Sequence, residues 1–265
     1  MKKIMVSVAA FAALFAPAFA EKLTYAKARE LLQKAEDNTA FYGTDFTASY
    51  EVVQDKPGEG RSKTNATIYR RDSESKWTIL ITAPIKDKGK GYLQANSTIW
   101  FYDPADRRFT FSSSKDKFQG TNANTSDFAP QRFVKDYDIK DNEQVNLGKL
   151  KCVLFTLEAK TKNVEYPRIK LWVTEDDGLM RMKEDYSLSG QKLRTTAVPS
   201  YQPVTGNGRD AKIPVNMVIQ DNLKGKKINN KIEYEKTLIS ISNATLSKQD
   251  DAVYTKPYLE LMSDR

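Results

Sequence analysis

The chain has 265 residues, of which 42 are Lys or Arg and 34 are Asp or Glu, with one cysteine and no histidine. A hydrophobic content of 40% is enough for a sizeable core, so the composition excludes a disordered chain and a transmembrane bundle. The absence of histidine excludes Ser-His-Asp and Cys-His hydrolases and His-ligated zinc sites. The net charge of +8 is mixed along the chain, which favours weak contact with anionic membranes and predicts no nucleic-acid partner.

Residues 1–20 have the pattern of a secretory signal peptide. Two lysines precede an apolar stretch, and Ala18 and Ala20 are the small residues that a signal peptidase requires. Cleavage before Glu21 is therefore expected, and no cysteine stands there for lipid attachment. We expect a periplasmic protein in which residues 21–265 form one domain.

The first element after this segment is a predicted helix from Tyr25 to about Asn38, which Thr24 can cap. From there to about residue 240 the apolar residues alternate with polar ones, which predicts strands with one buried face. The alternating residues are Phe46, Ala48, Tyr50 and Val52, then Trp77, Ile79 and Ile81, then Val153, Phe155 and Leu157, then Ile169, Leu171 and Val173, then Ile213, Val215, Met217 and Ile219. A second helix is expected at the C-terminus.

Turn residues separate these strands, and Asp177-Gly178 between two alternating runs is typical of a β-hairpin. About eleven strands with no helical pattern between them predict a mainly β fold, in which one antiparallel sheet curls into a half-open, incomplete barrel. Residues 99–102 are apolar or aromatic on both faces of their strand. A sheet with two apolar faces needs cover on both, so helices can cover one face while the other binds a ligand.

Motifs for catalysis are incomplete in this sequence. Ser112 and Lys115 form a Ser-x-x-Lys pattern, but the companion motifs of penicillin-recognising enzymes are missing. The acidic residues of 136–143 do not have the spacing of a calcium-binding loop, and a solvated segment is expected there. Cys152 lies in an apolar run, where an inert thiol is expected. We predict no catalytic residue, no metal and no cofactor.

Five segments resemble the outer-membrane lipoprotein-sorting protein family, whose members are LolA-like periplasmic carriers. They are residues 83–93 (Ala-Pro-Ile-Lys-Asp-Lys-Gly-Lys-Gly-Tyr-Leu), 99–108 (Ile-Trp-Phe-Tyr-Asp-Pro-Ala-Asp-Arg-Arg), 118–121 (Phe-Gln-Gly-Thr), 126–128 (Ser-Asp-Phe) and 254–259 (Tyr-Thr-Lys-Pro-Tyr-Leu). The resemblance implies a half-open antiparallel barrel closed by a few helices over its concave face. It also implies a cavity that shields acyl chains of lipoproteins or lipids and helps to sort them to the outer membrane.

A carrier of this kind needs large and adaptable apolar side chains around its cavity. The candidate lipid-binding residues are Trp77, Ile79, Trp100, Phe101, Phe109, Trp172, Met180, Met182 and Met217. For each of them a place in the core is an equally good interpretation. Arg107 and Arg108 are candidates for contact with a lipid headgroup, although pairing with Asp103 and Asp106 in their own turn explains them as well.

The expected partners are lipoprotein acyl chains or phospholipid, with transient contact with transport components of the inner and outer membranes, and the protein is expected to be a monomer. Two alternatives stay open at this point. One is a histidine-independent lipid hydrolase that uses Ser, Asp or a bound divalent cation in place of histidine. The other is a non-catalytic envelope adaptor that grips a protein rather than a lipid.

Overall fold

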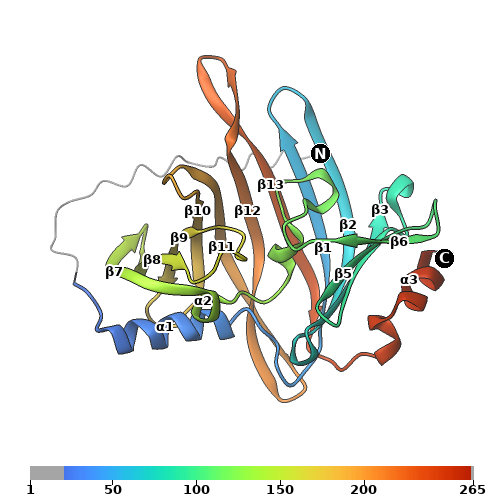
Figure 1. The fold of residues 1–265 in the computed structure, drawn as a ribbon, viewed down its shortest axis with the longest axis horizontal. Helices are drawn as coiled ribbons and strands as arrows, with labels where there is room; N and C mark the ends of the chain where they lie inside the picture. The colour runs from blue at the N-terminus through green and yellow to red at the C-terminus, as the bar shows by residue number, and fades with distance from the viewer. Residues whose placement is uncertain (1–20, 264–265) are drawn as a thin grey trace.

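A computed structural model describes residues 21–263 and consists of one large sheet with helices on both of its faces (Figure 1). The predicted signal peptide, residues 1–20, lies outside the described residues. The strands are β1 (Phe46–Lys56), β2 (Gly60–Arg71), β3 (Lys76–Ala83), β4 (Gly91–Ala95), β5 (Thr98–Asp103), β6 (Arg108–Ser112), β7 (Tyr137–Leu147), β8 (Leu150–Ala159), β9 (Arg168–Thr174), β10 (Met180–Tyr186), β11 (Lys192–Gly206), β12 (Arg209–Ile228) and β13 (Lys231–Thr245). The α-helices are α1 (Tyr25–Asp37), α2 (Phe133–Asp136) and α3 (Lys256–Ser263).

The sheet is built from two antiparallel meanders that meet at its centre. Its order is β6-β5-β4-β3-β2-β1-β13-β12-β11-β10-β9-β8-β7, so β1 pairs with β13 and the first half of the chain joins the last. The edge strands β6 and β7 do not pair, which leaves the barrel open and confirms the predicted fold class. The described residues form thirteen strands rather than about eleven. One reason is that β7 lies at the edge and buries only Asn142, so its sequence shows little hydrophobic alternation.

Residues 113–136, here called the crossing segment, connect the two edges of the sheet over its concave face (Figure 1). The backbone N–H of Asn122 donates to Oε1 of Gln54 at 3.1 Å and to Oγ1 of Thr237 at 2.8 Å, on the central strands β1 and β13. The segment contributes these side chains to the main core: Phe118, Ala123, Phe128 and Phe133. The crossing segment therefore fills much of the half-barrel.

Helix α1, which lies where the sequence predicted a helix, covers the concave face beside the crossing segment (Figure 1). Its buried residues Ala28, Leu32 and Ala35 share the spacing of one helix face. The Thr24 hydroxyl accepts a hydrogen bond from the Lys27 N–H at 3.5 Å and caps the first turn. At the other end, the Asn38 side chain donates to the backbone carbonyl oxygens of Asp177 and Gly178, in the β9–β10 turn, at 3.0 Å each.

Helix α3 packs on the convex face, over β3–β5. Leu259 is fully buried there against a second, smaller apolar cluster made of Leu80, Leu93 and Tyr102. Gly91 permits this close approach, because a Cβ at its position would lie 2.6 Å from Cδ2 of Leu259. The two apolar faces of this part of the sheet are thus covered by different elements, the convex one by α3. In residues 21–263, no helix is both long enough and apolar enough to cross a membrane.

Candidate functional site

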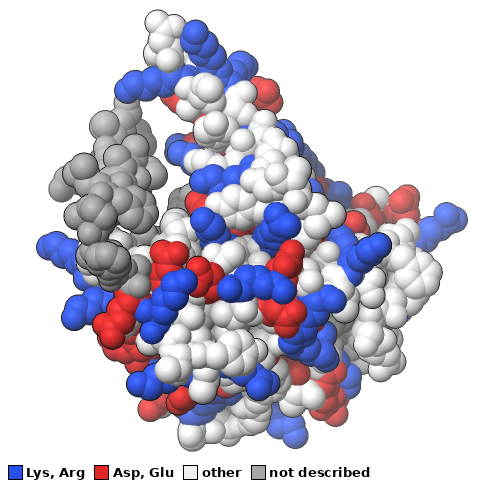
Figure 2. All heavy atoms as spheres, turned by 60° about the vertical axis from the view of Figure 1, so that its left-hand side comes forward, with Lys and Arg blue, Asp and Glu red and all other residues white. Residues whose placement is uncertain are grey.

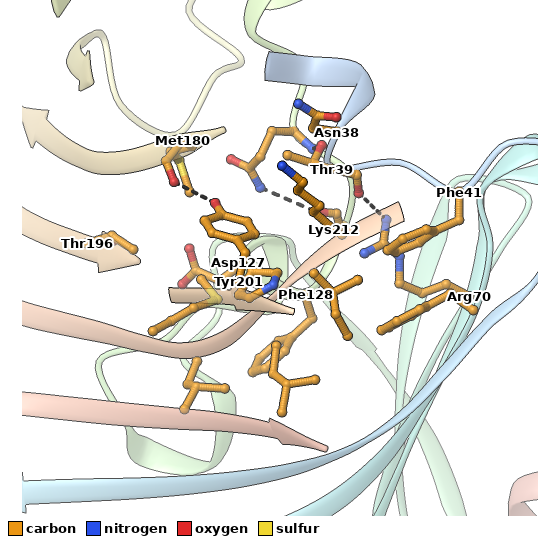
Figure 3. A pocket seen from close by; sticks show the side chains of 18 of the residues that line it. Asn38, Thr39, Phe41, Arg70, Asp127, Phe128, Met180, Thr196, Tyr201 and Lys212 are labelled. Carbon is orange, nitrogen blue, oxygen red and sulfur yellow. Dashed lines mark hydrogen bonds between the residues drawn. The ribbon is translucent and has the colours of Figure 1, made fainter. Parts of the chain in front are cut away.

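A cavity of about 80 Å³ lies on the concave face, between the C-terminal end of α1, the crossing segment and the central strands (Figure 3). We call it the central cavity. Most of its wall is apolar, from Ala35, Phe41, Phe46, Tyr50, Phe128, Ala129, Met180, Ile213, Pro214, Met217, Ile239 and Ile241. Its polar lining residues are Asn38, Thr39, Arg70, Asp127, Gln131, Lys183, Thr196, Tyr201 and Lys212.

Several polar groups of this wall have partners within the protein. The Arg70 guanidinium forms an ion pair with Asp72 at 2.6 Å, donates to the Thr39 carbonyl at 2.7 Å and lies over the Phe41 ring. The Tyr201 hydroxyl donates to the Met180 carbonyl at 2.5 Å. These two groups are satisfied by the protein, whereas the buried Thr196 hydroxyl has no hydrogen-bond partner among the described residues. Most of the remaining wall presents hydrocarbon to a ligand.

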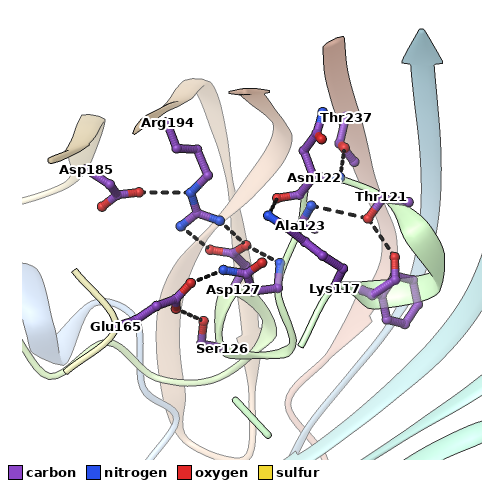
Figure 4. A network of polar contacts seen from close by, with 12 residues as sticks. Lys117, Thr121, Asn122, Ala123, Ser126, Asp127, Glu165, Asp185, Arg194 and Thr237 are labelled. Atoms are coloured by element: carbon purple, nitrogen blue, oxygen red, sulfur yellow. Dashed lines mark hydrogen bonds and ion pairs between the residues drawn. The ribbon is translucent and has the colours of Figure 1, made fainter. Parts of the chain in front are cut away.

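A buried ionic network fixes the crossing segment to the sheet beside the cavity (Figure 4). Arg194 in β11 forms two parallel hydrogen bonds to Asp127, at 2.7 and 3.0 Å, and a third to Asp185 at 2.8 Å. Lys183 also pairs with Asp185, at 3.2 Å. Burial alone would raise the pKa of Asp127, but the Arg194 and Lys183 charges and the hydrogen bonds to the carboxylate lower that pKa below its usual value. Asp127 is therefore held as a carboxylate in the folded protein.

Two of the nine predicted lipid-binding residues line the cavity, namely Met180 and Met217. Trp77 and Ile79 belong to the core of the concave face but lie outside the cavity wall. Phe101 is half-buried and packs against that core, with its ring 5.0 Å from the Tyr92 ring. Lipid contact by these residues stays a prediction.

The other four predicted residues face away from the cavity. Trp100 and Phe109 pack against the convex-face cluster beneath α3, and Lys256 of α3 lies over the Trp100 ring at 3.3 Å. Trp172 and Met182 are paired neighbours on β9 and β10. They lie on the convex face, because the alternate residues of these strands belong to the concave side. The nine predicted lipid-binding residues are thus divided between the concave and convex faces of the sheet.

Arg107 and Arg108 are exposed at the β5–β6 turn, and neither lines the cavity. The turn itself is stabilised by Asp103, whose Oδ1 accepts the Ala105 N–H at 3.0 Å. The ion-pair partner of Asp103 is Lys90, at 3.5 Å, rather than either arginine. Contact of these arginines with a lipid headgroup stays a prediction.

Sequence reasoning did not assign several residues of the cavity wall. Tyr50 and Ile213 were visible as members of alternating strands, but alternation does not show which part of a face stays unfilled. Phe128 and Tyr201 had no comparable signal, because the cavity is formed by segments far apart in the sequence.

Burial raises the pKa of the Cys152 thiol to about 11, as expected for an inert cysteine. Within residues 21–263, no group of three or more acidic or cysteine side chains is arranged to hold a metal ion.

Comparison with known proteins gives the family. A family model with the description "-like: Uncharacterized protein" matches residues 73–261, which is more than half of the chain. The solved structure of a LolA superfamily protein from Nitrosomonas europaea has a TM-score of 0.70 and 21% identity, over 87% of this chain and 98% of that one. The chain belongs to the family of that model, and its fold is that of the LolA superfamily structure.

Two further solved structures share the fold at the same TM-score of 0.70. One is described as an outer membrane lipoprotein-sorting protein domain from Vibrio parahaemolyticus, with 16% identity over 88% of this chain and 99% of that one. The other is a DUF1329 family protein from Desulfovibrio piger, with 18% identity over 87% and 97%. We found no significant match among curated proteins. The family match includes the crossing segment and β10–β13, while α1, β1 and β2 precede it.

Proposed function

We propose that this LolA-like protein is a periplasmic carrier that holds acyl chains of lipoproteins or phospholipids in the central cavity. The observation that carries the proposal is the mainly apolar cavity between α1, the crossing segment and the sheet. Each methylene group that moves from water into such a cavity makes the free energy of binding more favourable by about 0.8 kcal/mol. Carriage needs no catalytic group. The signal-like sequence of residues 1–20 supports export to the periplasm, where such a carrier would contact membrane transport components.

Uptake of a whole acyl chain would require the cover of the cavity to move. The cavity measures about 80 Å³, whereas an apolar cavity that takes up benzene measures about 150 Å³. The contacts that hold the cover include the Glu36 carboxylate, which accepts the Val134 N–H at 2.7 Å, and the Thr39 hydroxyl, which accepts the Gln131 N–H at 2.8 Å. Both join the end of α1 to the crossing segment. We infer that these two elements separate when a chain enters.

We expect Met217→Phe to weaken the binding of a fluorescent fatty-acid probe by about tenfold, because excluding two methylene groups from the cavity removes about that much affinity. The assay is a titration of the delipidated protein, residues 21–265. Met182→Phe is the matched control, since it makes the same change on the convex face. The carrier proposal fails if the unaltered protein binds neither the probe nor a diacylated peptide. Equal effects of the two variants would instead move the binding site away from the central cavity.

We expect Trp100→Ala to leave probe binding unchanged while it lowers the free energy of unfolding by about 2 kcal/mol. That is less than the cost for a fully buried tryptophan, because the ring is only half-buried beneath α3. Chemical denaturation and the same probe titration measure the two quantities. A loss of probe binding at unchanged stability would place the lipid under α3 rather than in the central cavity.

Lipid extraction and mass spectrometry of the protein purified from its envelope would name the cargo. A defined co-purified lipid or acylated protein is the expected result. A stoichiometric protein partner bound to a protein whose cavity is empty would favour the adaptor function instead.

A further inference from the structure

The end of the β12–β13 hairpin projects beyond the sheet. Pairing of β12 with β11 stops at Asp221, and pairing of β13 with β1 stops at Lys236. Beyond these points the two strands pair only with each other, and in Figure 1 the hairpin extends past its neighbours at the top of the molecule. An isolated two-stranded ribbon gains little stability of its own. Residues 222–232, here called the hairpin end, therefore add little to the core of the protein.

The hairpin end is strongly basic. Its eleven residues include Lys224, Lys226, Lys227 and Lys231 and no acidic residue, and all four lysines are exposed. Lys224 lies 3.8 Å from Glu235, while the other three lysines have no ion pair within the described part of the chain. Figure 2 shows basic side chains at this projecting end, whereas basic and acidic side chains are interspersed over the rest of the visible face.

Two large apolar side chains are exposed among these lysines. Leu223 is 54% exposed and lies where the β12–β13 register shifts, and Ile232 is 63% exposed and pairs with Lys227. Moving a leucine or isoleucine side chain from water into an apolar phase lowers the free energy. Placing the neighbouring lysines next to anionic groups lowers it further. A surface that combines the two is complementary to a membrane interface with anionic lipid headgroups.

We propose that the hairpin end docks the protein on an anionic phospholipid surface, with Leu223 and Ile232 entering the interface and the lysines contacting headgroup phosphates. This goes beyond the proposed carrier function, because docking does not require the central cavity to hold a ligand. Electrostatic attraction of this kind acts over about one Debye length, so the docking is salt-sensitive and reversible. A reversible contact suits a protein that leaves one membrane for another.

The test is flotation of the protein, residues 21–265, with vesicles of phosphatidylglycerol and phosphatidylcholine, compared with vesicles of phosphatidylcholine alone. We expect K226E/K227E to lower binding to the anionic vesicles by about tenfold or more, because two attractive charges become repulsive. The control K149E/K151E makes the same charge change at the β7–β8 turn, where both lysines are also exposed, and is expected to retain binding. Thermal unfolding of each variant is expected to match the unaltered protein.

The apolar part of the proposal has its own variant, L223S/I232S, with L150S as the control because Leu150 is an exposed leucine between two lysines at the β7–β8 turn. We expect about a tenfold loss for the hairpin variant and little change for the control. The proposal is overturned if the unaltered protein binds both kinds of vesicle equally, or if the two lysine variants lose binding alike. Because Met217→Phe acts in the cavity, its vesicle binding is expected to be unchanged, so failure of docking and failure of the carrier function are separable.

Discussion

Replacing Arg194 with methionine is expected to lower the free energy of unfolding by about 3–5 kcal/mol, the cost of leaving buried carboxylates without their charged partner. Arg194 is 3% exposed and bridges Asp127 of the crossing segment and Asp185 of β10. Chemical denaturation measures the loss. The control is Lys192→Met, which removes an ion pair with Glu184 between the same two strands. That pair is partly exposed, so the control is expected to cost less than about 1 kcal/mol.

The pH dependence of stability identifies the cause of this loss. The pKa of Asp127 is lower in the folded protein than in the unfolded chain, where it is about 3.9. Its contribution to stability is therefore complete above that pKa and is lost as the pH falls from about 5 through the folded-state pKa. In Arg194→Met the guanidinium no longer lowers the pKa, so the loss of stability on acidification should become smaller. An additional Asp127→Asn change should restore part of the stability; a further loss would contradict this account.

The strands and the first helix could be predicted because their signals are local. Phe155 and Leu171 are completely buried at the positions where alternation placed them. The Asp177-Gly178 turn joins β9 to β10, as its sequence indicates. Gly178 has a φ of +68°, a conformation that glycine adopts at little cost.

The distribution of aromatic residues between the two faces could not be predicted in the same way. Trp100 and Phe101 are adjacent and both large, yet one lies under α3 and the other faces the crossing segment. Alternation places successive side chains of a strand on opposite faces of the sheet, but it does not show which of these faces is the concave one. That choice depends on where α3 and the crossing segment pack, and both are placed by contacts distant in sequence, such as that between Asn122 and Thr237.

The motif Ser-Asp-Phe at 126–128 shows the same limit. Its sequence suggested only a family resemblance, whereas in the fold its two larger residues have separate tasks. Asp127 anchors the crossing segment through Arg194, and Phe128 turns into the central cavity. The Phe128 ring packs against Phe118 with centroids 4.8 Å apart and meets the Tyr50 ring edge-on at 5.8 Å. One short loop thus joins the stability of the cover to the shape of the cavity.

Phe128→Ala is therefore expected to change stability and ligand binding in opposite directions. The ring is 4% exposed, so its removal should lower the free energy of unfolding by about 3–5 kcal/mol. The same change enlarges a cavity of about 80 Å³ towards the size that admits small apolar ligands, so the fatty-acid probe should bind more tightly. Denaturation and probe titration on one preparation measure both effects.

The matched control is Phe133→Ala, which removes an equally buried ring from the same crossing segment but from outside the cavity wall. It should cost similar stability and bring no gain in affinity. If both variants lose probe affinity together, binding follows the integrity of the cover rather than the volume beneath it. If only Phe128→Ala gains affinity, the space between α1, the crossing segment and the central strands is the space that the acyl chain occupies, and its small size in the closed protein is the barrier to loading.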